Sequence, residues 1–245
     1  MATELCFFGP PHSGKTTLAL KTALYLAKNR NVILLFCDRV TPHLPWLFPR
    51  YRAEEIRSVG TALSAVDMTE EKLMESATVG KSGNLLFFGY GSGENRYSYP
   101  EFGAGRANAL FNSLDTLAET VVVDCTSDVT SDVLTEAALK RADGVFRIYT
   151  PDMSSFAFYD AQSPILHASD YREERHVKVL NCTEREIPLP ESEARAALHR
   201  DAIRVPFGKN FRRQRAEGTL AEEVPDKKTA AALQKLLDAV PPKES

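Results

Sequence analysis

The residues best suited to chemistry lie near the start of the chain, in the segment GPPHSGKTT at positions 9–17. Apolar residues at 5–8 precede it and a helix-like apolar pattern follows it, so the local order predicts a strand, a glycine-rich loop and a helix. The spacing G-x-x-x-x-G-K-T is that of a phosphate-binding P-loop. Chance produces the fixed positions in roughly one chain in a hundred of this length. The alternative interpretation is a Gly/Pro turn that precedes a helix.

Each residue type in such a loop has a chemical task. Backbone N–H groups surround a phosphate, and the positive end of the following helix dipole faces it. Lys15 can reach the β- and γ-phosphates, and the hydroxyl of Thr16 can ligate Mg²⁺. The pattern predicts a nucleotide site formed by the whole loop: Gly9, Pro10, Pro11, His12, Ser13, Gly14, Lys15, Thr16 and Thr17.

Two acidic residues follow apolar runs that are typical of buried strands. Asp38 follows the run 32–37, and Asp124 follows the run 120–123. Ligands of open α/β sheets bind at the carboxyl ends of strands. We therefore expect Asp124 to orient Mg²⁺ beside the phosphates, directly or through water. Asp38 is expected near the P-loop if its strand neighbours the first strand. The alternative for the second segment is a helix N-cap, for which the chain offers Ser127, Asp128 and Ser131.

The remaining pattern predicts the elements that hold these side chains. Strands are expected near 5–8, 32–37, 84–90, 120–124, 144–149, 177–181 and 203–205. Helices are expected at 15–29, from 69 onward with an Asp67–Glu70 capping box, at 104–119, 131–142, after 152, and at 192–199, 210–217 and 227–240. The class is therefore α/β, a doubly wound, mostly parallel sheet of about seven strands with helices on both faces. No repeat or linker divides the chain, so residues 1–245 are expected to form a single domain.

The segment 39–50 contains three prolines and the only tryptophan. These prolines exclude a long helix. The segment is expected to be a loop with apolar contacts, acting either as a lid or interaction surface or as a packed surface loop. His43 is expected at the loop surface rather than as a ligand.

The bulk composition excludes several classes of protein. The net charge of −3 gives no global attraction to nucleic acid or anionic lipid. No apolar run approaches the ~18 residues that a membrane span requires, and the N-terminus lacks the features of a signal peptide. We therefore expect a cytoplasmic protein. Four cysteines without a C-x-x-C pair are expected to be small buried hydrophobes, with a redox role as the alternative: Cys6, Cys37, Cys125 and Cys182.

With these motifs in order, most of the chain resembles the MinD/ParA branch of P-loop NTPases, including CpaE/TadZ-type relatives. The resemblance implies ATP and Mg²⁺ as cofactors, with Asp38 positioning the attacking water and Asp124 in the outer shell of the metal. It implies that Lys15, Asp38 and Asp124 are catalytic and that Thr16, Asp124 and Asp38 form the metal site. Residues 126–128 fall on the segment that senses the γ-phosphate. The late strand end KVLN and the loop VPFG correspond to the adenine site, which implies base contacts from Asn181, Pro206 and Phe207.

One position departs from the family pattern. The deviant P-loop of this branch carries a signature lysine five residues before the P-loop lysine, and Pro10 stands there instead. That lysine normally reaches the partner's phosphates in a nucleotide-sandwich homodimer and stabilises transition-state charge. Without it, the chain lacks the residue that normally supports the homodimer and fast hydrolysis in this family. Arg39 and Arg50 are candidate substitutes.

The leading hypothesis is a slow ATPase switch that positions or partitions a plasmid, a mobile element or a cellular machine. One alternative is a small-molecule kinase with an acceptor pocket near Trp46 and Tyr90, and another is an ATP-binding module without turnover. The expected partners are ATP, a second copy of the chain, and a partner protein or non-specific DNA. DNA would bind a basic cluster, for which a solvated helix face is the alternative: Lys209, Arg212, Arg213 and Arg215. The absence of an N/T-K-x-D motif favours ATP over GTP. The apolar face of 227–240 is expected to dock on the sheet rather than on a membrane surface.

Overall fold

The computed structural model describes residues 1–81, 83–182, 189–199 and 201–242. Within them one sheet runs in the order β3-β4-β2-β5-β1-β6-β7-β8. All neighbouring pairs are parallel except β3–β4, which is antiparallel. The strands are β1 Thr3–Phe8, β2 Val32–Phe36, β3 Thr78–Val79, β4 Leu85–Phe88, β5 Thr120–Asp124, β6 Gly144–Tyr149, β7 His176–Asn181 and β8 Ile203–Val205.

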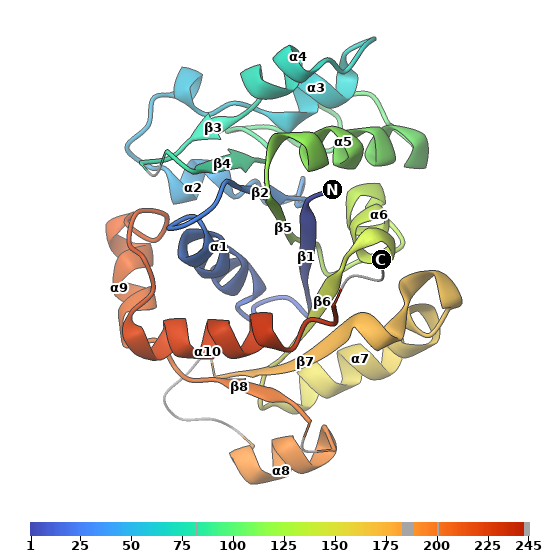
Figure 1. Ribbon diagram of the computed structural model, residues 1–245, viewed down its shortest axis with the longest axis vertical. Coiled ribbons are helices and arrows are strands. Elements are labelled where there is room, and N and C mark those ends of the chain that lie inside the picture. The colour runs from blue at the N-terminus through green and yellow to red at the C-terminus, as the bar shows by residue number, and fades with distance from the viewer. Residues whose placement is uncertain (82, 183–188, 200, 243–245) are drawn as a thin grey trace.

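Helices cover both faces of this sheet (Figure 1). They are α1 Lys15–Leu26, α2 Leu44–Leu47, α3 Val59–Ser64, α4 Glu70–Glu75, α5 Ala104–Leu117, α6 Val133–Arg141, α7 Met153–Leu166, α8 Glu191–Ala197, α9 Lys209–Glu217 and α10 Lys227–Asp238. Short 3₁₀ turns lie at Ala53–Glu55, Ser169–Tyr171 and Glu173–Arg175. The predicted doubly wound class is confirmed.

Alternation along the strands divides the core into two layers. On β1, Cys6 and Phe8 face the layer that α5, α6 and α7 cover, while Leu5 and Phe7 face the layer of α1 and α10. Because both faces are covered, the central strands are mostly apolar, as parallel strands usually are; buried Glu4 on β1 and Arg147 on β6 are exceptions.

Several local expectations need correction. The sheet has an additional edge strand, β3, which is only two residues long and too short to produce a periodic signal. The sequence pattern also did not predict the helix α3. The N-cap of α4 is Thr69, whose side chain accepts from the N–H of Lys72, so the Asp67–Glu70 capping box is wrong. The segment 39–50 contains the short helix α2, and α6 is capped by Asp132.

Two other expectations are confirmed. The four cysteines are buried and form no disulfide with one another. Helix α10 packs against the sheet through Ala232, Leu233 and Leu236. Among the helices that the structure describes, none combines the length and apolar character that crossing a membrane would need.

Candidate nucleotide-binding site

The P-loop connects the central strand β1 to α1 at the carboxyl edge of the sheet. Gly9 lies against β6, where a Cβ atom would come within 2.7 Å of the carbonyl oxygen of Ile148. Gly14 has φ 83° and is the N-cap of α1, a left-handed conformation that glycine adopts without strain. The two glycines therefore let the loop turn tightly and leave the first N–H groups of α1 directed at the pocket.

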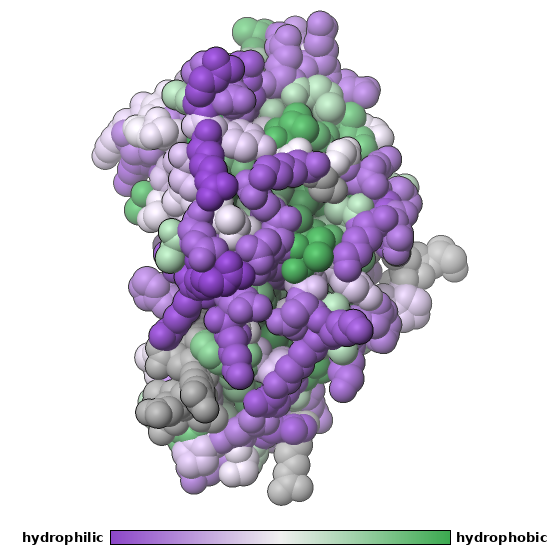
Figure 2. Space-filling model, turned by 90° about the vertical axis from the view of Figure 1, so that its left-hand side faces the viewer, coloured by the Kyte–Doolittle hydropathy of each residue, from purple (hydrophilic) through white to green (hydrophobic). Residues whose placement is uncertain are grey.

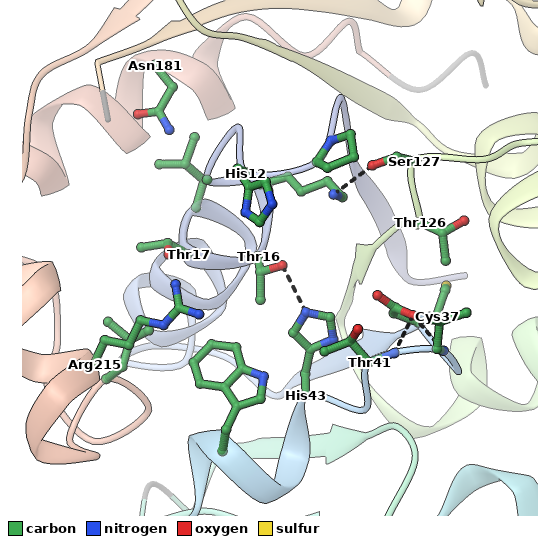
Figure 3. A pocket seen from close by; sticks show the side chains of 18 of the residues that line it. His12, Thr16, Thr17, Cys37, Thr41, His43, Thr126, Ser127, Asn181 and Arg215 are labelled. Atoms are coloured by element: carbon green, nitrogen blue, oxygen red, sulfur yellow. Dashed lines mark hydrogen bonds between the residues drawn. The ribbon is translucent and has the colours of Figure 1, made fainter. Parts of the chain in front are cut away.

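Lys15 lies across the loop. Its Nζ donates to Ser127 Oγ at 3.0 Å, and Ser127 Oγ donates to the carbonyl oxygen of Gly9 at 2.8 Å (Figure 3). Ser127 belongs to the segment after β5, so these bonds join the P-loop to the region expected to sense a γ-phosphate. The lysine is held at the pocket by a neutral hydroxyl, which a phosphate can replace as its partner.

Asp124 lies at the end of β5 and is 2% exposed. Burial raises its pKa, while His43 and Lys15 lower it and Asp38 raises it further. Its Oδ1 has no hydrogen-bond partner among the described residues. A buried carboxylate with an unpartnered oxygen, close to the hydroxyl of Thr16, is a donor set that Mg²⁺ accepts. These residues fit the expected cation.

Asp38 follows β2, which pairs with β5. Its Oδ1 accepts from the N–H groups of Val40 and Thr41 at 2.8 and 2.9 Å. These two bonds hold residues 38–41 in a turn, and Asp38 lines the pocket. Asp38 lines the same pocket as the P-loop although β5 lies between its strand and β1, so the two strands are not neighbours. Its role in positioning water stays a prediction.

Asn181, Pro206 and Phe207 lie at the other end of the same pocket, which measures about 1220 Å³. Asn181 is buried at the end of β7, and its Nδ2 donates to the carbonyl oxygen of Ser13 at 2.8 Å. The pocket therefore extends from the cation residues past the P-loop to the expected base site. Base binding by these three residues also stays a prediction.

The sequence interpretation of His43 is wrong. Its side chain is only 13% exposed, and its Nε2 lies 3.3 Å from Thr16 Oγ1 and 3.9 Å from Asp124 Oδ2. Nothing in the local sequence indicates this contact, because the three residues come from three different elements. The proline-rich composition of 39–50, which indicated a packed loop near the carboxyl edge, is the nearest available signal.

The sequence predicted only some of the basic residues that lie at the pocket. Arg39, Arg96, Arg212 and Arg215 line the pocket. Arg50 instead donates to the carbonyl oxygen of Glu217 and is not among the residues that line the pocket. Of the two residues expected to form an acceptor pocket, Trp46 lines the cavity, whereas Tyr90 is buried in the core.

The predicted basic cluster on α9 does not form one free surface. Arg212 and Arg215 line the pocket, and Arg215 lies 5.1 Å from the Trp46 ring. Arg213 pairs with Glu217 and Glu223. The face that carries α9 is mostly hydrophilic, with smaller hydrophobic areas between the hydrophilic ones (Figure 2). These contacts favour a role at the pocket for two of the four residues over DNA binding.

No family model and no curated protein matches the sequence. Solved structures do match over almost the whole chain. A ParA family ATPase from Chlorobium tepidum TLS superposes with a TM-score of 0.77 at 13% identity, covering 96% of this chain and 98% of that one. The chain has the ParA/MinD fold.

Two further structures of this fold are described with nucleotide. The septum site-determining protein MinD from Pyrococcus horikoshii OT3, complexed with Mg-ADP, gives a TM-score of 0.72 at 16% identity, with 97% and 96% of the two chains covered. A plasmid partition protein from Borrelia burgdorferi B31, bound to AMPPNP, gives 0.71 at 13% identity, with 98% of each chain covered. At these identities the likeness establishes the ParA/MinD architecture, and the chemistry must be argued from the residues of this chain.

Proposed function

We propose that this chain is a Mg²⁺-dependent ATP-binding protein, and a slow or partner-stimulated ATPase switch that positions or partitions a cargo. The observation that carries the proposal is that Lys15 and Thr16 line a pocket large enough for a nucleotide, with the buried carboxylate of Asp124 close to both. Support also comes from neighbours of the same fold that are described with Mg-ADP and AMPPNP.

The proposed roles follow from charge and position. Lys15 and the backbone N–H groups of 12–17 would hold the phosphates, since Pro10 and Pro11 have none, and Thr16 and Asp124 would hold Mg²⁺. That ion supplies positive charge that stabilises the phosphoryl oxygens. Asp38 would position the water, and Asn181, Pro206 and Phe207 would bind adenine. The 38–48 and 125–130 segments would change conformation with the γ-phosphate and so change partner affinity.

Hydrolysis in this chain would proceed without the signature lysine, because Pro10 stands at that position. Arg39 and Arg96 line the pocket, as do Arg212 and Arg215, and any of these cations is a candidate to supply charge in its stead. A second candidate function, an ATP-binding module without turnover, is favoured by Pro10 at that position.

Phosphate release from Mg-ATP, measured over a range of protein concentrations with Lys15→Ala as the blank, separates the two. Turnover per chain that rises with concentration supports an ATP-dependent homodimer that completes the site. Zero turnover, with ATP binding shown separately, supports the module. Turnover that depends on an added small-molecule acceptor would instead support a kinase.

A further inference from the structure

A histidine side chain lies between the two residues that would hold the cation. His43 Nε2 is 3.3 Å from the hydroxyl of Thr16 (Figure 3). It is 3.9 Å from the carboxylate of Asp124. Asp124 is almost fully buried and retains an oxygen without a partner among the described residues. The imidazole is thus one of the groups that face this carboxylate, together with Lys15 and the hydroxyl of Thr16.

The ring and a bound Mg²⁺ compete for the same volume. Mg²⁺ takes oxygen ligands at about 2.0–2.1 Å and usually keeps several waters. Imidazole is a ligand for other metals such as zinc, copper and nickel. A ring placed 3.3 Å from the ligand hydroxyl and 3.9 Å from the carboxylate occupies space that the ion and its waters need.

We propose that His43 fills the cation position in the nucleotide-free protein and leaves it when magnesium nucleotide is bound. The inference rests on the proposed function and concerns how the same site is regulated. In this arrangement Thr16 and Asp124 are partly satisfied without a metal, and the departure of one side chain marks the loaded state.

The surroundings of His43 determine what moves. Its ring stacks on Phe36, with centroids 5.4 Å apart and planes inclined by 16°. The following residues Leu44 and Leu47 are fully buried and hold α2 in the core. Departure from the cation position is therefore a rotation of the His43 side chain rather than a movement of the helix.

Trp46 is the residue that senses this rotation. Its ring centroid lies 5.6 Å from that of His43, and the guanidinium of Arg215 lies 5.1 Å from the ring. A contiguous set of contacts thus leads from the cation position through His43 and Trp46 to α9. The state of the cation site is thereby transmitted to a surface helix.

The test uses the intrinsic fluorescence of the protein, because Trp46 is its only tryptophan. ADP is first titrated in EDTA, with a fluorescent ADP analogue as an independent binding signal, and Mg²⁺ is then titrated onto the ADP complex. In the wild type we expect Trp46 emission to change in the Mg²⁺ step. In His43→Ala we expect ADP affinity in EDTA to be unchanged. The Mg²⁺ concentration at half effect, read in both proteins from the fluorescent ADP analogue, should fall by about three- to tenfold, since one competing hydrogen bond is lost.

The Trp46 signal gives a second criterion that does not depend on turnover. In His43→Ala the emission change in the Mg²⁺ step should be largely lost, because the ring that moves is absent. His167→Ala is the matched control, since His167 is half exposed, pairs with Glu173 and lies outside the pocket lining. It should behave as the wild type in both titrations.

Three results would overturn the inference. A higher Mg²⁺ requirement in His43→Ala would make the histidine a ligand of the loaded site. An unchanged Mg²⁺ requirement with an unchanged Trp46 signal would make it a bystander. An absence of any Mg²⁺-dependent emission change in the wild type, with ADP bound, would show that the ring stays in place; failure to bind ADP under every condition would instead remove the proposed function and this inference with it.

Discussion

Lys15 and Lys21 lie on the same helix, less than two turns apart, in opposite surroundings. Lys15, at the N-terminal end of α1, faces the pocket and donates to the neutral hydroxyl of Ser127. Lys21, in the middle of α1, is fully buried and donates to the carbonyl oxygens of Leu220 and Glu223 at 2.8 and 2.6 Å. One lysine has a partner that a ligand can replace, while the other has partners fixed by the fold.

Lys15 is therefore available to bind a ligand, whereas Lys21 stabilises the fold. Lys21 joins α1 to the turn that follows α9, and its ammonium also lies 5.5 Å from the Phe211 ring. Burial lowers its pKa to about 8, against the opposing effects of Glu223 and Asp226. A lysine at the start of α1 is therefore placed to bind a negatively charged ligand, and a lysine in the middle of α1 makes tertiary hydrogen bonds.

Removal of the Lys15 ammonium should give the largest functional effect. In Lys15→Ala, ATP affinity should fall by about 100-fold or more, because a charge-assisted contact to phosphate is lost in a partly buried site. The free energy of unfolding in urea should change by less than about 1 kcal/mol, since the lost partner is one hydroxyl. Equilibrium binding of a fluorescent ATP analogue and urea titration measure the two quantities, and a large loss of stability with retained binding would reverse the comparison.

Removal of the Lys21 ammonium should do the opposite. Lys21→Met keeps most of the side-chain volume but leaves two carbonyl oxygens without a partner, so the free energy of unfolding at pH 7 should fall by about 2 kcal/mol. ATP affinity should stay within about threefold of the wild type, because the residue does not line the pocket. Urea titration of wild type and variant provides the measurement. Equal stability of the two proteins would mean that the cost of burying the charge cancels the hydrogen bonds.

The pH dependence sharpens the same contrast. The pKa of Lys21 is lowered to about 8 in the folded chain from 10.5, so between these values the unfolded chain binds more protons. Stability of the wild type relative to Lys21→Met should therefore rise with pH, by about 2 kcal/mol between pH 8 and pH 10. The neutral amine still donates to both carbonyl groups. Urea titrations of both proteins across this range test the sign, and a falling difference would contradict the burial of the ammonium.

Local patterns are sufficient to predict the parts of the site that lie within one segment. The P-loop combines strand, glycines and lysine in consecutive residues, and Asp124 directly follows a run of valines. Alternating apolar runs likewise predict the sheet, apart from the two-residue strand β3. Such features depend only on near neighbours along the chain, and the sequence alone therefore indicates them.

Contacts between distant segments cannot be predicted in this way. The carbonyl partners of Lys21 lie about two hundred residues further along the chain, and Lys21 itself looks like an ordinary exposed position of an amphipathic helix. His43 meets Thr16 and Asp124 only because β2 pairs with β5, which in turn pairs with β1. Side chains of this kind acquire their roles from tertiary packing, for which the sequence has no local signature.

The burial of the four thiols has a practical consequence for measuring conformational changes of this protein with an attached dye. Burial raises the pKa of the thiols of Cys6, Cys37, Cys125 and Cys182, so the reactive thiolate is suppressed as long as the chain is folded. A cysteine introduced at an exposed position such as Val40 would take a maleimide dye while the native thiols stay unmodified. The slow alkylation rate of the native thiols would then measure how often the core opens.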